Sequence, residues 1–479
     1  MMKKWVCGLA AVAAAVAGCA CAQDAKTWDV HSVVDLSHGF TFYADGRFAK
    51  QYLGTHRSVM NWNALYNFDL SNANLMVLLD CESRLNYTDK DVACITKFLE
   101  EGGGIALFVS SPTCHNAELA KRFGAVYEEG AAQPLKPVAA LNVDKVEGRA
   151  SIRLAAGGKG QWTPLVTDAD GAMVAGMRKI GKGRLMVAPR GFSGSNPDAS
   201  DPINAAWLAP VLERLAQGKA VDKAKPFNGR NLTDADNIEK HPDLTFYYSD
   251  YLKSYATAML DITRRTKPFI EKRMGVPLAE GMGTQVGLLA TGGGGFSGGT
   301  LLGLAAWWGG FPEKEDSMIE FITHETVHSW VLPFPEVWNE PIATYVGNLV
   351  MIDMGHEAEA TKRIAETIAR ARRHDPDMKL YDLDGKPART EAKTLEYGPA
   401  NDIHWGKTFW IFEELRKEKP DFFAAYFQLK RKHATPGSMK KYTLDSTVAL
   451  LSKAMGRDLF PWFREIGCDV DPARSEIRF

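Results

Sequence analysis

Phe321-Ile322-Thr323-His324-Glu325-Thr326-Val327-His328-Ser329-Trp330 is the stretch that decides how the second half of this chain folds. It contains the pattern His-Glu-x-x-His. On a helix, residues four positions apart lie on one face, so both imidazoles would point at the same spot. Apolar residues at helical spacing surround the pattern, as a buried helix requires: Met318, Ile319, Ile322, Val327 and Val331. The stretch therefore predicts a buried helix that presents two histidines to a metal ion.

A carboxylate follows 12 positions after the second histidine, at Glu340 in the segment 338–345. The turn 332–335, with two prolines, should end the first helix, and Asn339 is expected to N-cap the next one. Two neutral imidazoles and one carboxylate leave a zinc ion with an open position for water. Glu325 could take a proton from that water without binding the metal. We therefore expect one zinc ion held by His324, His328 and Glu340, with Glu325 as the general base of a peptidase.

These residues resemble the His-Glu-x-x-His-x-Trp … Asn-Glu-x-x-Ala-x-Tyr signature of gluzincin metallopeptidases, in particular the aminopeptidase N type. The resemblance implies the same ligands and base, on an α+β zincin-like domain with a helical C-terminal lobe. The interval between His328 and Glu340 is shorter than in aminopeptidase N and closer to that of the enhancin and mucin-peptidase family. The Gly-x-Met-Glu-Asn segment that holds a substrate amino terminus in aminopeptidases is absent. Exopeptidase and endopeptidase activity therefore both stay open.

A cluster of glycines, 292–299, lies between two predicted strands, Gln285–Ala290 and Thr300–Ala305. It lacks the Gly-Lys-Ser/Thr ending of a phosphate-binding loop, which argues against nucleotide binding. We expect this loop at the rim of the active site, where its backbone would pair with an extended peptide as an added strand. The alternative is a long flexible hairpin.

The segment 397–407 is expected to interrupt a helical run before Thr408–Leu415. In peptidases of this type a Tyr or His donor opposite the base stabilises the oxyanion together with zinc. His404-Trp405-Gly406-Lys407 stands where aminopeptidase N relatives have a Tyr-x-Lys-Gly segment. Tyr397 and His404 are therefore both candidate donors, although His404 could instead be an ordinary residue at a helix start.

Residues 28–219 alternate between strand and helix patterns. Leu75–Asp80 and Ile105–Val109 are short apolar runs typical of strands buried on both faces. Between them, Thr88 and Asp91 form the signature of a helix capping box. The pattern predicts a mostly parallel, three-layer, flavodoxin-like α/β domain. It resembles the class I glutamine-amidotransferase-like fold.

An amidotransferase would need a cysteine on a Gly-x-Cys-x-Gly turn between a strand and a helix. Cys114 follows a predicted strand, but no glycine flanks it. The first half is therefore expected to be an accessory domain that positions the peptidase or binds part of a substrate. An amidotransferase-like hydrolase that uses Cys114 is the alternative.

The start of the chain predicts export. Lys3 and Lys4 precede an apolar run of signal-peptide length, so residues 1–22 are interpreted as a signal peptide. Val16-Ala17-Gly18-Cys19 resembles the lipobox of bacterial lipoproteins, which would lipidate Cys19 and anchor the protein to the outer membrane. Cleavage after Ala22 would instead release it to the periplasm or the medium. Residues 220–243 are expected to form a linker, and 244–479 the peptidase domain.

The composition limits the classes of molecule that the protein is expected to bind. With 24% charged residues, a formal net charge of −1 and no Lys/Arg-rich block, the 479-residue chain shows no sign of nucleic-acid binding. No Cys-x-x-Cys pair is present, which argues against a cysteine zinc site. A peptide or glycoprotein is the expected substrate. A catalytically inactive protein of the same fold that binds glycan or peptide is the alternative function, and the oligomeric state is not predicted.

Overall fold

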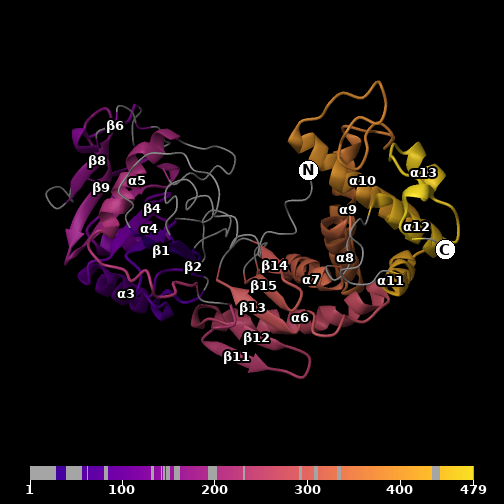
Figure 1. The fold of residues 1–479 in the computed structure, drawn as a ribbon, viewed down its shortest axis with the longest axis horizontal. Helices are drawn as coiled ribbons and strands as arrows, with labels where there is room; N and C mark the ends of the chain where they lie inside the picture. Colours follow the sequence, from indigo (N-terminus) through magenta and orange to yellow (C-terminus); the bar gives the residue numbers. More distant parts are fainter. Residues whose placement is uncertain are drawn as a thin grey trace.

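A computed structural model shows a sheet region at one end of the molecule and a helical region at the other, with a smaller sheet between them (Figure 1). The predicted signal peptide, Cys19, Ala22 and the turn 332–335 lie outside the described residues. The structure describes residues 29–38, 57–61, 63–79, 85–130, 134–141, 143, 146, 151–155, 162–192, 202–229, 232–290, 294–306, 311–331, 336–433 and 443–477.

The first region is built on an eight-stranded sheet with the strand order β2-β1-β3-β4-β10-β9-β8-β6. The first five strands in this order, β2, β1, β3, β4 and β10, pair in parallel with one another. The pairs β10–β9, β9–β8 and β8–β6 are antiparallel. The strands are β1 (His31–Asp35), β2 (Arg57–Asn61), β3 (Leu75–Leu78), β4 (Gly104–Val109), β6 (Lys136–Pro137), β8 (Thr163–Thr167), β9 (Met173–Ile180) and β10 (Gly183–Pro189). The sheet is therefore mixed, and the prediction of a mostly parallel sheet holds only for its first five strands.

The antiparallel part arises because no helix separates β9 from β10. The chain reverses over two residues, and Gly181 takes a positive φ of 57° there, which favours glycine. A two-residue connection can join only antiparallel neighbours, since a parallel pair needs a crossover.

Helices cover both faces of this sheet. Along β3, Leu75 and Val77 point into a core shared with Trp207 of α5 (Pro202–Ala216). Met76 and Leu78 point to the opposite core, shared with Phe98 of α3 (Asp89–Glu100). The helix α4 (His115–Arg122) packs on the same side as α3. This alternation gives the three layers that the buried strands predicted.

A second sheet of five strands has the order β11-β12-β13-β15-β14, so that β14 is an edge strand. The strands are β11 (Asn237–Lys240), β12 (Thr245–Tyr248), β13 (Gln285–Leu289), β14 (Gly295–Ser297) and β15 (Leu301–Ala305). The strand β14 comes from the glycine cluster and was not predicted, and β11 lies within the predicted linker. The domain boundaries and the zincin-like topology stay predictions.

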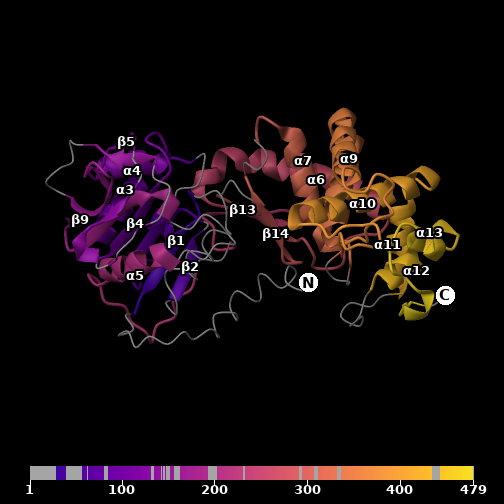
Figure 2. The ribbon, with the colours of Figure 1, turned by 90° about the horizontal axis from the view of Figure 1, so that it is seen from above.

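The remainder of the second half is helical (Figures 1 and 2). The main helices are α6 (Lys253–Met274), α7 (Glu315–Val331), α8 (Asn339–Asp353), α9 (Glu357–Arg372), α10 (Tyr397–Glu418), α11 (Phe422–His433), α12 (Leu444–Met455) and α13 (Phe460–Glu465). The expected interruption at 397–407 is wrong, since α10 is continuous from its first residue. Gly406 lies so close to α9 that a Cβ there would meet the Thr367 carbonyl oxygen at 2.4 Å. None of the helices in the described ranges combines the length and apolarity needed to cross a bilayer.

The two regions meet at Tyr251, just before α6. Its hydroxyl donates a hydrogen bond to Asp91 at the start of α3 and accepts one from the Leu65 backbone N–H at 2.8 Å. The helix α6 in turn packs against α7. The first region is therefore linked to the helix that carries the His-Glu-x-x-His pattern.

Candidate metal centre

Two helices that pack against each other, α7 and α8, carry the predicted ligands. On α7, His324 and His328 stand one turn apart, and their Nε2 atoms lie 3.1 Å from each other. The helix is buried along almost its whole length because apolar side chains flank the pattern on both sides. The helical spacing thus brings the two imidazoles together as predicted.

The Glu340 carboxylate, near the start of α8, faces both imidazoles. Its Oε2 lies 3.3 Å from Nε2 of His324, and its Oε1 lies 3.6 Å from Nε2 of His328. Around a tetrahedral zinc ion with bonds of about 2.0–2.2 Å, ligand atoms lie roughly 3.3–3.6 Å apart. The three groups therefore have the spacing of ligands around one ion, and Glu340, whose side chain is 53% exposed, leaves one side of the site open.

Glu325 belongs to the same cluster. Together with His324 and His328 it forms a group that could hold a metal ion, with one ligand atom from each residue within 4.8 Å of the others. Two carboxylates are thus available to the histidines, one buried and one half-exposed. We assign Glu340 to the ligand position because its two oxygens face both Nε2 atoms at once.

The other ring nitrogens are held by protein groups. His324 Nδ1 lies 2.9 Å from Thr344 Oγ1, and His328 Nδ1 lies 3.0 Å from Asn339 Oδ1. An amide oxygen can only accept, so His328 carries its proton on Nδ1 and its Nε2 is free to bind a metal. Asn339 was expected to be the helix N-cap. Trp338 occupies that position, and Asn339 is the first helical residue and orients His328 instead.

Glycine is required beside Glu325. A Cβ at Gly295, on the edge strand β14, would lie 2.8 Å from Cγ and Cδ of Glu325. The backbone of the glycine cluster therefore contacts the expected base directly, and no signal in the sequence indicated this contact.

Burial and charge shift the titration of the site in the metal-free protein. Burial raises the pKa of Glu325 to about 7, with a further contribution from the charge of Glu340. Burial alone would lower the pKa of His324, but its hydrogen bond with Glu340 and the charges of Glu325 and Glu320 raise it to about 9. Burial and the neighbouring His324 lower the pKa of His328 to about 4. A carboxylate with a pKa near 7 is suited to exchange protons at neutral pH.

The two candidate oxyanion donors lie two turns apart on α10. Tyr397 is its first residue and is 81% exposed. Burial raises the pKa of the Glu340 carboxyl, but His324, His328 and, more weakly, His404 lower it below its usual value. His404 Nδ1 lies 3.0 Å from the Leu383 carbonyl oxygen, so Nδ1 is the donor, and in a neutral ring Nε2 is an acceptor and offers no N–H to an oxyanion. The roles of both residues stay predictions.

Cys114 is the N-cap of α4, where its Sγ accepts a hydrogen bond from the Ala117 N–H at 3.3 Å. Its turn lacks the flanking glycines that an amidotransferase elbow needs. Among the described residues, Cys94 and Cys468 are free thiols. Burial raises the pKa of Cys94 to about 11 and of Cys468 to about 12, which disfavours the reactive thiolate.

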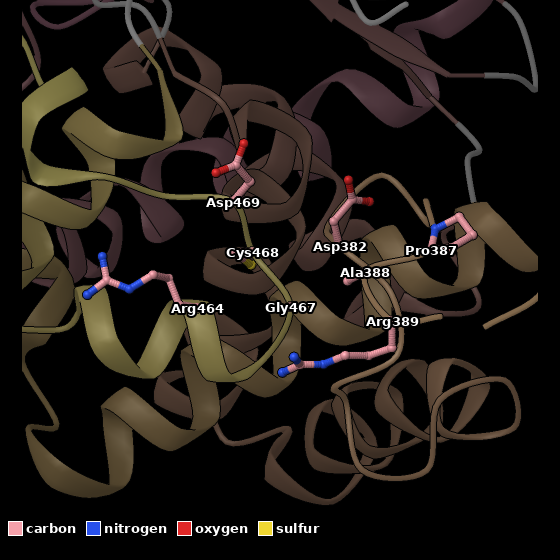
Figure 3. A pocket seen from close by; sticks show the side chains of 8 residues that line it. All are labelled: Asp382, Pro387, Ala388, Arg389, Arg464, Gly467, Cys468 and Asp469. Carbon is pink, nitrogen blue, oxygen red and sulfur yellow. The ribbon is translucent and has the colours of Figure 1, made fainter. Parts of the chain in front are cut away.

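A cavity of about 310 Å³ lies elsewhere, in the helical region (Figure 3). Positively charged arginines and negatively charged aspartates line it, and none of the predicted site residues is part of its lining. Arg389 of this cavity donates to the Glu465 carbonyl oxygen at 2.9 Å. We therefore assign the cavity no part in the candidate metal centre.

The comparisons with known proteins do not assign this chain to a family. No protein-family model matches it, and no curated protein sequence matches it. Solved structures match parts of it. Yeast LTA4 hydrolase aligns with 47% of this chain and 38% of its own, at 14% identity and a TM-score of 0.32. An exo-β-1,4-mannosidase from Opitutaceae bacterium strain TAV5 aligns with 41% of this chain and 37% of its own, at 12% identity and a TM-score of 0.29.

A putative ThuA-like protein from Parabacteroides merdae aligns with 41% of this chain and 93% of its own, at 12% identity and a TM-score of 0.28. The chain spans less than two-fifths of the length of the hydrolase and the mannosidase. At these scores the similarities carry no functional argument, so the function is argued from the site alone.

Proposed function

We propose that the protein is an exported zinc-dependent peptidase that hydrolyses peptide bonds of extracytoplasmic proteins or glycoproteins. The observation that carries the proposal is the convergence of His324, His328 and Glu340, with the buried Glu325 beside them. His324, Glu325 and His328 are the group of three His, Cys, Asp or Glu side chains in the described ranges whose ligand atoms have the spacing of a metal site, and Glu340 faces the same two imidazoles.

The donor set fits zinc. Two imidazole nitrogens and one carboxylate are the ligands of catalytic zinc sites, and such sites keep one position open. When bound there, zinc polarises the scissile carbonyl and lowers the pKa of a coordinated water. Thr344 and Asn339 hold the imidazoles in the orientation that this donor set needs.

Glu325 supplies the proton transfer. Its carboxylate accepts a proton from the attacking water and passes it to the leaving amine. Burial raises its pKa to about 7 in the metal-free protein, which favours a carboxylate that both accepts and returns protons. Tyr397 and His404 are the candidate donors for the oxyanion.

The edge strand β14 is the candidate substrate platform. Among the strands in the described ranges it pairs with β15 at the edge of the sheet, and Gly295 brings its backbone against Glu325. An extended peptide that added to this edge would lie beside the base. This geometry suits a chain passing through the site, and it supports endopeptidase activity.

The test is Glu325→Gln, which keeps the shape of the side chain and removes the base. Wild type should cleave a denatured protein or a mucin glycopeptide library, with products identified by mass spectrometry. The variant should bind zinc as wild type does and cut at least a thousandfold more slowly. Glu315→Gln, in the first turn of the same helix, is the matched control and should cleave normally.

The alternatives give different results. Full zinc occupancy with glycopeptide capture but no product from wild type would favour a binding protein. An activity that survives Glu325→Gln and disappears in Cys114→Ala would favour the amidotransferase-like hydrolase.

A further inference from the structure

A buried carboxylate lies just before the helix that carries the third ligand. Glu336 is three residues before Asn339, and its side chain is 1% exposed. Its partner Lys430, on α11, is equally buried, and their charged atoms lie 2.6 Å apart. Lys430 is 94 residues further along the chain, so the pair joins two distant elements.

The two oxygens of Glu336 have different partners. Oε1 accepts hydrogen bonds from the backbone N–H groups of Val337 at 2.9 Å and Trp338 at 3.3 Å. Oε2 accepts from Lys430 Nζ and, at 2.7 Å, from the Tyr426 hydroxyl. One oxygen thus holds the residues that lead into α8, and the other is fixed to α11.

Packing of its side chain also fixes the position of Trp338. It is 2% exposed, and its ring packs on Phe412 with ring centroids 5.4 Å apart. Asn339 and Glu340 follow it directly. Any shift of Trp338 therefore moves the residue that orients His328 and the carboxylate that faces both imidazoles.

Stability alone does not account for this pair. Removing two charges from water is costly, and buried ion pairs can often be replaced by apolar residues without loss of stability. Burial indeed lowers the pKa of the Lys430 ammonium. An apolar side chain at position 336 could not, however, accept the two backbone N–H groups before α8.

We propose that Glu336, fixed by Lys430 and Tyr426, is a positioning residue that sets the start of α8 and so aims Asn339 and Glu340 at the metal. The inference rests on the proposed zinc site. Groups that orient metal ligands are worth about 10–100-fold in metal affinity.

The experiment compares two neutral versions of the pair. Glu336→Gln with Lys430→Met keeps an oxygen for the two backbone N–H groups. Glu336→Met with Lys430→Met removes it, and neither variant buries a charge at the pair. Zn²⁺ affinity is measured by competition with a chelating dye, and the ligand field by the absorption of bound Co²⁺. Near-UV circular dichroism and thermal unfolding report folding.

We expect the Gln/Met version to bind Zn²⁺ within about threefold of wild type. The Met/Met version should bind at least tenfold more weakly, with an altered Co²⁺ spectrum. The matched control is Arg273→Met with Asp353→Asn, which removes an ion pair at the opposite end of α8. It should lower the melting temperature and leave Zn²⁺ affinity within about threefold.

A folded Met/Met version with wild-type affinity and spectrum would overturn the proposal. If that version does not fold, Glu336→Gln with Tyr426→Phe and Lys430→Met provides a second test, because it keeps an oxygen for the two backbone N–H groups, removes both α11 partners and buries no charge. Wild-type affinity in that variant would also overturn the proposal. Failure of wild type itself to bind Zn²⁺ would instead refute the proposed function, and the inference with it.

Discussion

Histidine and carboxylate side chains form two clusters in this molecule, and the two clusters differ in exposure and in hydrogen bonding. In the first region, His38 lies between Asp35 and Asp91, and each of the three is at most 4% exposed. In the second, His324 and His328 face Glu340, whose side chain is half-exposed. The two clusters differ in what their polar atoms contact.

Protein donors occupy the oxygens of the first cluster. Asp35 accepts from His38 Nδ1 and from Ser37 and Asn61, and Asp91 accepts from Thr88 and Tyr251. In the second cluster the Nε2 atoms of His324 and His328 lie 3.1 Å apart, and both face the Glu340 carboxylate. Protein donors thus satisfy the carboxylate oxygens of the first cluster, whereas the second cluster directs two ring nitrogens and a carboxylate at a common point.

The largest expected effect separates the clusters by metal binding. Replacing His324 by Ala removes one of three ligands, so Zn²⁺ affinity should fall at least a thousandfold, roughly 4 kcal/mol. His38→Ala is the matched change in the first cluster and should leave Zn²⁺ affinity unchanged. Chelator competition measures both, and a comparable loss in His38→Ala would contradict the distinction.

The second effect separates them by stability. Asp91→Ala removes the acceptor for Thr88 and Tyr251 and the reciprocal half of the capping box, so we expect a loss of about 3 kcal/mol. Urea unfolding followed by circular dichroism measures it. Asp89→Ala, on the same first turn but exposed, is the control and should change little. Equal losses in the two variants would show that the buried cluster adds no stability.

The third effect concerns the glycine beside the base. Gly295→Ala places a Cβ within 2.8 Å of the Glu325 side chain, which must move. We expect kcat/KM to fall about 10–100-fold, or 1.4–2.8 kcal/mol, with unchanged Zn²⁺ affinity. Gly298→Ala is the control, since its Cβ would meet only the Leu301 carbonyl oxygen at 3.6 Å. Equal kcat/KM values for the two variants would show that β14 is not part of the active site.

The smallest effect is a pH dependence. Zinc requires neutral His324, whose pKa in the metal-free protein is about 9, whereas His328, with a pKa of about 4, is already neutral. Below pH 9 a proton must leave His324, so Zn²⁺ affinity should rise roughly tenfold per pH unit from pH 6 to 8 and level off above 9.

Glu325→Gln provides the check on this slope. It removes the other group that titrates near pH 7 and a charge that holds up the pKa of His324. The affinity should therefore still rise with pH but level off earlier. A flat profile between pH 6 and 8 in both proteins would mean that no proton leaves His324.

Local patterns in the sequence were sufficient for much of the fold. The capping box of Thr88 and Asp91 forms as expected. The spacing of His324 and His328 gave their common face, because four residues nearly complete one helical turn. These predictions depend on neighbours in the chain.

Errors arose where glycine and proline act through packing. Gly398 and Pro399 suggested an interruption, but they lie in the first turn of α10, where a missing backbone N–H costs no helical bond. Gly406 permits close contact with α9. Glycine likewise forms β14, because a side chain at Gly295 would collide with Glu325. The helix and strand propensities of neighbouring residues carry no information about such contacts between distant segments.

Glu336 could not have been selected from the sequence. Its partners Tyr426 and Lys430 lie 90 and 94 residues away, and nothing in the local pattern indicates that a charged residue beside prolines is buried. Only the packing of α11 against the start of α8 reveals the contact.

The length of β14 limits how the proposed enzyme would read a substrate. Three residues of strand extend about 10 Å, so main-chain pairing could fix the register of only about three substrate residues. Broad tolerance of sequence is the natural outcome, with discrimination left to side-chain or glycan contacts further out. So short and half-buried an edge strand also offers little template for strands of other molecules, which lowers the risk of aggregation.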